Sequence, residues 1–386
     1  MKQGRRLAAA VLAACLTAAV PALAAQADTA GSAVNAAQAK SVLLMERETG
    51  TVLYEENADQ PLEPASVTKI MTLLLVTEAL DSGRITLGDL VTVSEYAASM
   101  GGSQVYLEAG EQMTVDDLLK AVAVASGNDA AVALAEYLAG SEEAFVEEMN
   151  QRAEQLGMEN TQFLNCTGLP EEGHVTSARD IALMSRELMG HDLIRGYTAI
   201  WMDTLRDGEF QLANTNKLLR SYSGATGLKT GFTDSALYCI SATAQRDGME
   251  LIAVVMGAPT AEARSDIASA LLDYGFANYA LVQVKPGQAL PPVPVLLGQT
   301  ATVQPMLEGE CVLLVEKSKQ NLITTQVTLA QDVEAPVEAG QKLGEMAVLV
   351  DGVTQATVPI VAAQPVERLT WAGIFGDLVR QLFLAS

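Results

Sequence analysis

The spacing of hydrophobic residues changes twice along the chain, and the changes predict a mixed α/β region followed by an all-β region. Two short apolar runs, at 42–45 and 51–54, are separated by turn residues at 48–50 and predict a β-hairpin. Apolar residues at helical spacing then predict a helix from about Ser66 to Glu78, which Pro64 introduces.

More helices and then strands are expected after this first helix, with Thr114 and Ser177 as side chains suited to N-caps. The pattern predicts helices at 118–125, 129–138, 142–156 and 178–189. It predicts strands at 228–232, 238–242 and 251–256, and a last helix at 261–274. This order predicts an α+β domain over residues 37–279, in which an antiparallel sheet is flanked by helices and accompanied by a helical lobe.

The composition changes after about Tyr279, where prolines cluster at 286–294. Short runs rich in Val, Leu and Thr follow, at 312–315, 322–329 and 347–350, between Gly and Pro turns. Such a pattern predicts a small β-sandwich-like domain over residues 280–365.

Residues 366–386 have the pattern of an amphipathic helix. Its apolar positions are Trp371, Ile374, Phe375, Leu378, Leu382 and Phe383. Aromatic residues on the apolar face favour a helix that lies in a membrane interface. A helix docked on its own protein is the alternative.

The first 24 residues have the pattern of a signal peptide rather than of a folded element. A basic start precedes an apolar run at 7–20 and the small-residue cleavage pattern Ala22-Leu23-Ala24. A lipoprotein signal ending at Cys15 is less favoured, because the residues after it stay apolar as far as Ala25. The chain is therefore predicted to be exported.

Composition excludes some classes of function. The 386 residues carry a net charge of −23, which argues against binding to nucleic acid and against purely electrostatic binding to anionic lipid. Cys166, Cys239 and Cys311 remain after cleavage, and their spacing fits no metal site. Each is expected to be a small buried hydrophobe, with a bridge between Cys166 and Cys239 as the less favoured alternative.

The first motif with chemical potential is Ser66-Val67-Thr68-Lys69. Residues three apart on a helix share one face, so the lysine amine can reach the serine hydroxyl. A serine needs a base to become a nucleophile, and we interpret Ser66 as the nucleophile and Lys69 as the base. Alone, the pattern also fits an ordinary helix start with an exposed lysine.

The second motif, Ser126-Gly127-Asn128, lies where the chain bends between two predicted helices. Ser126 is a candidate for passing a proton to the leaving amine, and Asn128 for holding Lys69 and the substrate backbone. Simple turn chemistry is the alternative, because all three residues favour turns.

The third motif, Lys229-Thr230-Gly231, lies on a predicted strand. Gly231 has no side chain, so a peptide substrate can pair there as an extra strand. The backbone N–H groups of Phe232 and Ser66 are then the expected oxyanion donors. Lys229 and Thr230 are candidates for binding a substrate carboxylate, and Arg264 is another.

The chain has only two histidines, His174 and His191, and neither lies in a nucleophile or metal motif. A Ser-His-Asp mechanism therefore has little to build on, and His174 is expected to be a structural loop residue. The sequence contains no paired metal motif or phosphate-binding glycine loop, so no metal or cofactor is expected.

With these motifs in this order, the chain resembles serine penicillin-recognising enzymes, and more narrowly low-molecular-weight penicillin-binding proteins of the D-alanyl-D-alanine carboxypeptidase (peptidase S11) family. The resemblance rests on the segments 64–72, 125–130, 176–180, 214–219 and 227–233. It implies a β-lactamase/penicillin-binding-protein-like catalytic fold that continues into the β domain and a tail that anchors the enzyme.

The resemblance also implies an activity. Such an enzyme removes the terminal D-alanine from peptidoglycan stem pentapeptides through an acyl-enzyme at Ser66, and β-lactam antibiotics trap the same serine. It acts on the extracytoplasmic face of the bacterial membrane. The matching active-site positions are Ser66, Lys69, Ser126, Asn128, Lys229 and Thr230, and Arg264 matches the arginine that binds the substrate carboxylate.

Three positions depart from the family pattern. Leu237 stands where many members have glycine, and Cys166 stands where proline is usual. Phe232 stands where a polar or hydroxylated ring is common and is expected to alter the rate at which water removes the acyl group.

Other functions remain open at this point. A D,D-endopeptidase that cuts cross-links would use the same chemistry on a bulkier substrate. A β-lactamase is less favoured, because Thr161 stands where its glutamate would be. A non-catalytic wall-binding protein is disfavoured by the intact Ser66 and Lys69.

Overall fold

A computed structural model describes residues 36–373, 375 and 376, and the structural statements below concern these residues. The predicted signal peptide and most of the predicted tail helix lie outside them. Within them, no helix is both long enough and apolar enough to cross a membrane.

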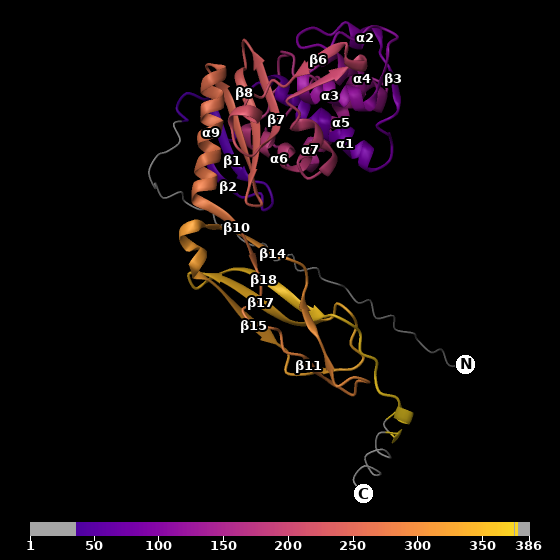
Figure 1. Cartoon of the computed structure of the whole chain (residues 1–386), viewed down its shortest axis with the longest axis vertical. Coiled ribbons are helices and arrows are strands. Elements are labelled where there is room, and N and C mark those ends of the chain that lie inside the picture. Colours follow the sequence, from indigo (N-terminus) through magenta and orange to yellow (C-terminus); the bar gives the residue numbers. More distant parts are fainter. Residues whose placement is uncertain (1–35, 374, 377–386) are drawn as a thin grey trace, which may run out of the picture. The chain divides into compact units, whose positions relative to one another are not determined.

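An antiparallel sheet of five strands forms the centre of the first domain (Figure 1), in the order β2-β1-β9-β8-β7. The strands are β1 (Ser41–Glu46), β2 (Val52–Glu56), β7 (Ala225–Thr233), β8 (Leu237–Arg246) and β9 (Met249–Ala258). Each neighbouring pair is antiparallel, including the predicted hairpin of β1 and β2. The predicted α+β class is confirmed.

Both faces of this sheet are covered, which explains why β9 is buried at every position and has no polar side chain except Glu250. Successive residues of a strand point to opposite faces. Ile252 and Val254 accordingly join the core on the side of the helical lobe, whereas Leu251 and Ala253 join the core under α9 (Ala261–Asn278). Figure 1 shows α9 along one side of the sheet and α6 (Ala178–Leu188) on the other.

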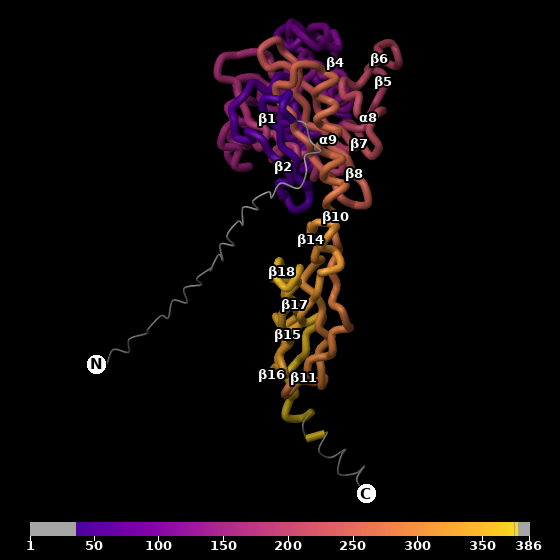
Figure 2. The backbone as a smooth tube through the Cα atoms, turned by 90° about the vertical axis from the view of Figure 1, so that its left-hand side faces the viewer, coloured from indigo at the N-terminus to yellow at the C-terminus, as the bar shows by residue number. Residues whose placement is uncertain are grey.

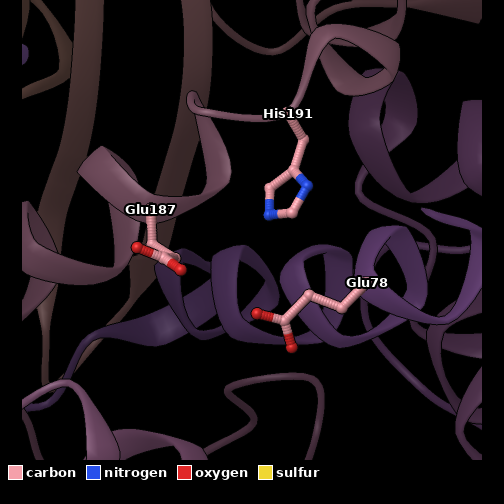
Figure 3. A group of neighbouring side chains, drawn as sticks. All are labelled: Glu78, Glu187 and His191. Atoms are coloured by element: carbon pink, nitrogen blue, oxygen red, sulfur yellow. The ribbon is translucent and has the colours of Figure 1, made fainter. Parts of the chain in front are cut away.

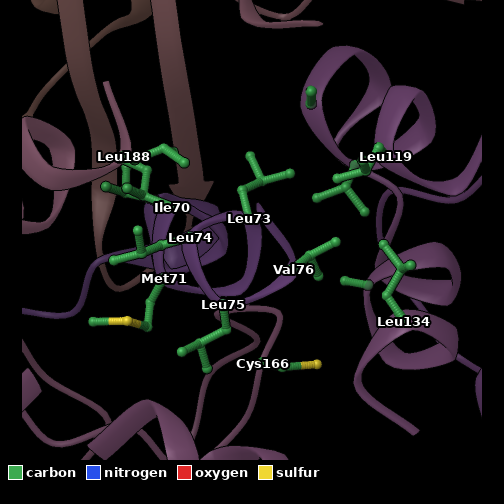
Figure 4. Close-up of a cluster of buried hydrophobic side chains, with 14 of the residues drawn as sticks. Ile70, Met71, Leu73, Leu74, Leu75, Val76, Leu119, Leu134, Cys166 and Leu188 are labelled. Atoms are coloured by element: carbon green, nitrogen blue, oxygen red, sulfur yellow. The ribbon is translucent and has the colours of Figure 1, made fainter. Parts of the chain in front are cut away.

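The helical lobe is built around α1 (Lys69–Asp81), whose residues from Lys69 to Thr77 are all buried. Side chains point away from α1 in all directions, toward Leu119 and Leu134 on one side and Leu188 on another (Figure 4). A helix that is apolar all round belongs in the centre of a domain rather than on its surface.

The start of this helix differs from the prediction. Ser66 does not open an α-helix but lies in a 3-10 turn, η1 (Ala65–Thr68), and α1 begins only at Lys69. The turn is tight because two backbone segments press on it: a Cβ added at Gly168 would lie 1.8 Å from Ala65 O, and one at Gly231 would lie 3.0 Å from Ser66 N.

The other predicted helices are present, within four residues of the expected ends. They are α3 (Val115–Ala125), α4 (Asn128–Ala139), α5 (Glu142–Gln155), α6 and α9. Thr114 and Ser177 cap helices as expected, because each hydroxyl accepts a backbone N–H from the residue three positions later.

Seven α-helices and β-strands of this domain were not predicted, and each has seven residues or fewer. They are α2 (Glu95–Ala98), α7 (Asp192–Thr198), α8 (Leu218–Ser221), β3 (Leu90–Thr92), β4 (Gln112–Thr114), β5 (Met202–Leu205) and β6 (Phe210–Ala213). Segments this short hold too few positions to establish a hydrophobic period.

The described residues from 279 to 362 lie mainly in β-strands, as predicted for this region (Figure 2). β10 (Tyr279–Val284) pairs with β14 (Cys311–Glu316), and two further sheets have the orders β12-β11-β16 and β13-β18-β17-β15. Their strands are β11 (Val293–Leu296), β12 (Thr302–Val303), β13 (Pro305–Leu307), β15 (Ile323–Leu329), β16 (Val333–Glu334), β17 (Lys342–Val350) and β18 (Val353–Ala362). A 3-10 helix, η3 (Lys317–Leu322), precedes β15. The domain boundaries at 37, 279 and 365 stay predictions.

The three cysteines in the described part of the chain are buried and free. The alternative of a bridge between Cys166 and Cys239 is therefore wrong, and the expectation of small buried thiols holds. The Cys239 thiol instead contacts the carbonyl oxygen of Ala236.

Leu119 is fully buried in the helical-lobe core around α1, so its truncation is expected to lower stability strongly. We expect Leu119→Ala to lower the free energy of unfolding by about 2–5 kcal/mol, because a cavity is left in a close-packed interior. Urea denaturation measures it. The matched control Leu90→Ala, at a residue that is 57% exposed, should change stability by less than about 0.5 kcal/mol. Equal losses in both variants would contradict this packing.

Candidate active site

Three segments that are distant in sequence meet around Ser66. They are the turn η1 with the start of α1, the bend between α3 and α4, and strand β7. The absence of a side chain at Gly231 allows β7 to approach the turn, because a Cβ there would lie 2.8 Å from Pro64 O and 3.0 Å from Ala65 Cβ. All three predicted motifs thus contribute to one place.

Lys69 lies at the centre of this candidate site, and its side chain is completely buried. Its Nζ lies 3.1 Å from Ser66 Oγ, 2.5 Å from Asn128 Oδ1 and 2.7 Å from Thr167 O. The amine is therefore surrounded by three oxygens from three different segments.

The hydrogen bonds fix the direction in which the amine faces. Asn128 Nδ2 donates to Gly101 O at 2.6 Å, which leaves Asn128 Oδ1 as an acceptor toward Lys69. Thr167 O is also only an acceptor. A neutral amine has two N–H groups, and these two acceptors use both. The lone pair of the neutral amine is then directed at Ser66 Oγ, as a general base that removes the hydroxyl proton requires.

Burial favours this neutral form. Desolvation lowers the pKa of Lys69 from its ordinary value to about 7, and the smaller influences of Cys166 and Asp129 act in the opposite direction. An amine with a pKa near 7 is neutral for a substantial fraction of the time at neutral pH and can accept a proton.

Ser126 is held at the bend in a left-handed conformation, with φ of 63°, at the C-terminal end of α3. Its side chain is buried, and its Oγ has no hydrogen-bond partner within the described part of the chain. An unpaired buried hydroxyl is costly and is a mark of a group that awaits a partner.

Lys229 and Thr230 lie on β7 and are almost fully buried. Lys229 Nζ donates to Thr230 O at 2.9 Å. Burial, and then the repulsion of Lys69 and Arg264, lowers the pKa of Lys229 well below its ordinary value. Thr230 Oγ1 lies 2.6 Å from the hydroxyl of Thr215, a residue not selected from the sequence.

Arg264 comes from α9 and lies behind β8. Its Nη1 donates to Cys239 O at 3.5 Å, and Cys239 pairs with Gly231 in the sheet. Among the residues that the structure describes, none is a hydrogen-bond partner of the buried Arg264 Nε, so this guanidinium retains capacity to bind an anion. The exposed ring of Phe232 stacks on Tyr238, with ring centres 4.4 Å apart, and the guanidinium lies 5.8 Å from the Tyr238 ring.

Sequence reasoning missed Thr167, which acts through its backbone carbonyl. No side-chain pattern marks such a group. The local clue is Gly168, whose position against Ala65 O excludes any side chain and brings the loop 161–175 onto the nucleophile turn.

A second cluster of acidic and histidine side chains, at Glu78, Glu187 and His191, has the spacing of a metal site (Figure 3). A cation already belongs to it, since the Arg152 guanidinium lies 2.7 Å from a Glu78 oxygen and 2.6 Å from a Glu187 oxygen. His191 pairs with Asp81 at 2.5 Å. We interpret the cluster as a structural ion-pair network.

Comparison with known proteins shows the family of the chain. A family model described as D-alanyl-D-alanine carboxypeptidase matches residues 26–260, and one described as the C-terminal domain of penicillin-binding protein 5 matches residues 283–368.

Individual relatives match along most of the chain. D-alanyl-D-alanine carboxypeptidase DacF of Bacillus subtilis is 44% identical over 336 residues, 86% of each chain. DacC of Escherichia coli is 35% identical over 92% of each chain. A crystal structure of penicillin-binding protein 5 from Haemophilus influenzae superimposes with a TM-score of 0.75 at 31% identity, over 88% of this chain and all of the other.

The lowered pKa of Lys69 predicts the pH dependence of Ser66 acylation. Only the neutral amine accepts the Ser66 proton, so the second-order rate constant for acylation by a penicillin should rise about tenfold per pH unit below pH 7 and level off above it. Stopped-flow fluorescence with a fluorescent penicillin measures it.

Lys229→Gln is the control for this profile, because glutamine does not titrate. The variant should react more slowly but keep the rise near neutral pH. A rate independent of pH between 5 and 8 in the wild type, or a rise that disappears in Lys229→Gln, would remove Lys69 as the base.

Proposed function

The chain belongs to the D-alanyl-D-alanine carboxypeptidase family of serine peptidases, and we propose that it removes the terminal D-alanine of peptidoglycan stem pentapeptides with Ser66 as nucleophile. The observation that carries this proposal is the enclosed amine of Lys69, whose Nζ lies within hydrogen-bond distance of Asn128 Oδ1, Thr167 O and Ser66 Oγ.

The reaction follows from these positions. Lys69 takes the hydroxyl proton while Ser66 Oγ attacks the carbonyl carbon of the last peptide bond. The backbone N–H groups of Ser66 and Phe232 stabilise the oxyanion. The proton on Lys69 then passes through the Ser126 hydroxyl to the leaving amine, and the C–N bond breaks to release D-alanine. Water then hydrolyses the ester, which releases the shortened peptide as its acid and returns a proton to Ser66 Oγ.

The positive groups around the site support a substrate that ends in a carboxylate. Lys69 and Arg264 lie close enough to Lys229 to lower its pKa further by repulsion, after the larger effect of burial, so an anion placed among these groups is attracted. We propose that Lys229, Thr230 and Arg264 bind the terminal carboxylate while Gly231 and Phe232 pair with the peptide backbone. β-Lactams, which carry a carboxylate beside a strained amide, enter the same site.

The alternatives differ in how well the residues support them. A β-lactamase is disfavoured because Thr161 Oγ1 donates to Asp180 Oδ2 at 2.8 Å and lies 2.7 Å from the Thr176 hydroxyl, so this position serves the loop rather than a catalytic water. A D,D-endopeptidase remains the second candidate, since a cross-link peptide can present the same carboxylate.

We also propose that the enzyme is exported and works at the outer face of the membrane. The predicted signal peptide at 1–24 supports export. The aromatic side chains of Trp371 and Phe375, which are 87% and 70% exposed, support attachment to a membrane surface through residues 366–386. The proposed domains are 37–279 for catalysis and 280–365 for the β domain.

Labelling decides the nucleophile. We expect a penicillin to form one covalent adduct, which peptide mass spectrometry locates at Ser66, and Ser66→Ala to form none. The unmodified enzyme should release D-alanine from diacetyl-Lys-D-Ala-D-Ala, and Ser66→Ala should not. An adduct on another residue would reject the mechanism. Cleavage of a cross-linked muropeptide with no release from the tripeptide would favour the endopeptidase.

Removal of the residues after Pro365 tests the tail. The full mature chain should sediment with membrane vesicles, and the shortened chain should remain in the supernatant with unchanged D-alanine release. Equal fractionation of the two chains would show that the tail is not the anchor.

A further inference from the structure

We propose that His174 is a positioning residue for the reaction: through Thr68 it holds the carbonyl of Ala65, and so fixes the nucleophile turn against the loop that supplies Thr167 O to Lys69. This inference rests on the proposed role of Ser66. It assigns a task to a histidine that the sequence suggested was only a loop residue.

A short chain of hydrogen bonds leads from His174 to the residue before the nucleophile. His174 Nε2 lies 2.9 Å from Thr68 Oγ1, and Thr68 Oγ1 donates to Ala65 O at 2.9 Å. Ala65 has a φ of 48°, a left-handed conformation that costs an L-residue energy unless its surroundings hold it. The Thr68 hydroxyl is part of what holds it.

The chain has a defined direction. The backbone N–H of Leu164 donates to His174 Nδ1 at 3.1 Å, so Nδ1 must be the acceptor and Nε2 must carry the proton. The Thr68 hydroxyl receives this N–H and gives its own proton to Ala65 O. In a doubly protonated imidazole, Nδ1 would carry a hydrogen that points at the backbone N–H of Leu164, and neither group could accept.

The same loop contacts the catalytic lysine. Thr167 O accepts from Lys69 Nζ, Cys166 O accepts from Thr72 Oγ1, and Gly168 packs directly on Ala65. His174 therefore joins the two ends of one arrangement: the loop that orients the amine and the turn that carries the hydroxyl. Without the hydrogen bonds from His174 to Thr68 and from Thr68 to Ala65, the distance between Lys69 Nζ and Ser66 Oγ is less tightly fixed.

The surroundings keep His174 in the required neutral form. Its side chain is buried and packs edge-on against Phe163, with ring centres 5.9 Å apart. Burial lowers the pKa of His174 to about 4, against the weaker opposite influence of the carboxylates of Glu171, Glu63 and Glu142.

A pair of substitutions separates positioning from mere packing. His174→Gln keeps one acceptor and one donor on a side chain that does not titrate, whereas His174→Phe keeps a ring against Phe163 but has neither. We expect acylation of Ser66 by a fluorescent penicillin to stay within about threefold of wild type in the Gln variant and to fall by about 10- to 100-fold in the Phe variant.

The steady-state parameters should divide in the same way. In the Phe variant kcat for D-alanine release should fall while KM changes little, because the carboxylate-binding groups are untouched. Thermal melting shows whether each variant is folded. If the Phe variant does not fold, Thr68→Val breaks the same chain at its other member and should give the same fall in acylation. In a folded double variant the two losses should not add, because they interrupt one chain.

Two results would overturn the inference. One is a folded Phe or Val variant that acylates as fast as wild type. The other is a Gln variant as slow as the Phe variant, since the donor and acceptor would then not matter. These results are distinct from failure of the proposed function, in which the wild-type enzyme itself would not be labelled at Ser66.

Discussion

An amine enclosed by protein can act as a base only if the protein supplies partners for its hydrogens and leaves its lone pair free. Lys69 meets this requirement with Asn128 Oδ1 and Thr167 O, and both acceptors are fixed by their own surroundings. The rest of the domain can be understood from this constraint. The acceptors come from the α3–α4 bend and from the loop 161–175, so the packing of the helical lobe around α1 determines the chemistry at Ser66.

Such a site is costly to fold. An unfolded lysine takes up a proton below its ordinary pKa of 10.5, whereas folded Lys69 does so only below about 7. Burial of this one amine therefore opposes folding at neutral pH and below, by about 5 kcal/mol. Lys229 is buried as well, and its neighbours Lys69 and Arg264 add repulsion. The continuous apolar cores on both faces of the sheet offset these costs, and a substrate carboxylate would relieve part of them.

Motifs in the sequence pointed to side chains that the structure brings together around Lys69, but not to the Thr167 carbonyl. Ser66, Lys69 and Asn128 could be found because motif spacing and helical period place them together. The Thr167 carbonyl could not, since every residue has one, and only the fold brings it to the amine. The 3-10 turn at Ala65–Thr68 was predicted as α-helix for the same reason: Gly168 and Gly231, from distant parts of the chain, tighten it.

Two of the departures from the family pattern, at Cys166 and Leu237, can be explained from their contacts and backbone conformation. Cys166, in a position where proline is usual, donates its backbone N–H to Glu142 Oε1 at 2.9 Å, a bond that proline cannot make. Leu237, in a position where glycine is frequent, has a φ of 59°, in the region where glycine is favoured and a leucine is strained. Its turn joins the strand that carries Gly231 and Phe232 to the strand whose Cys239 carbonyl binds Arg264. A strained residue at this turn is tolerated only where the neighbouring strands are well anchored. Neither departure removes a group from around Lys69, so both are compatible with the chemistry of the family.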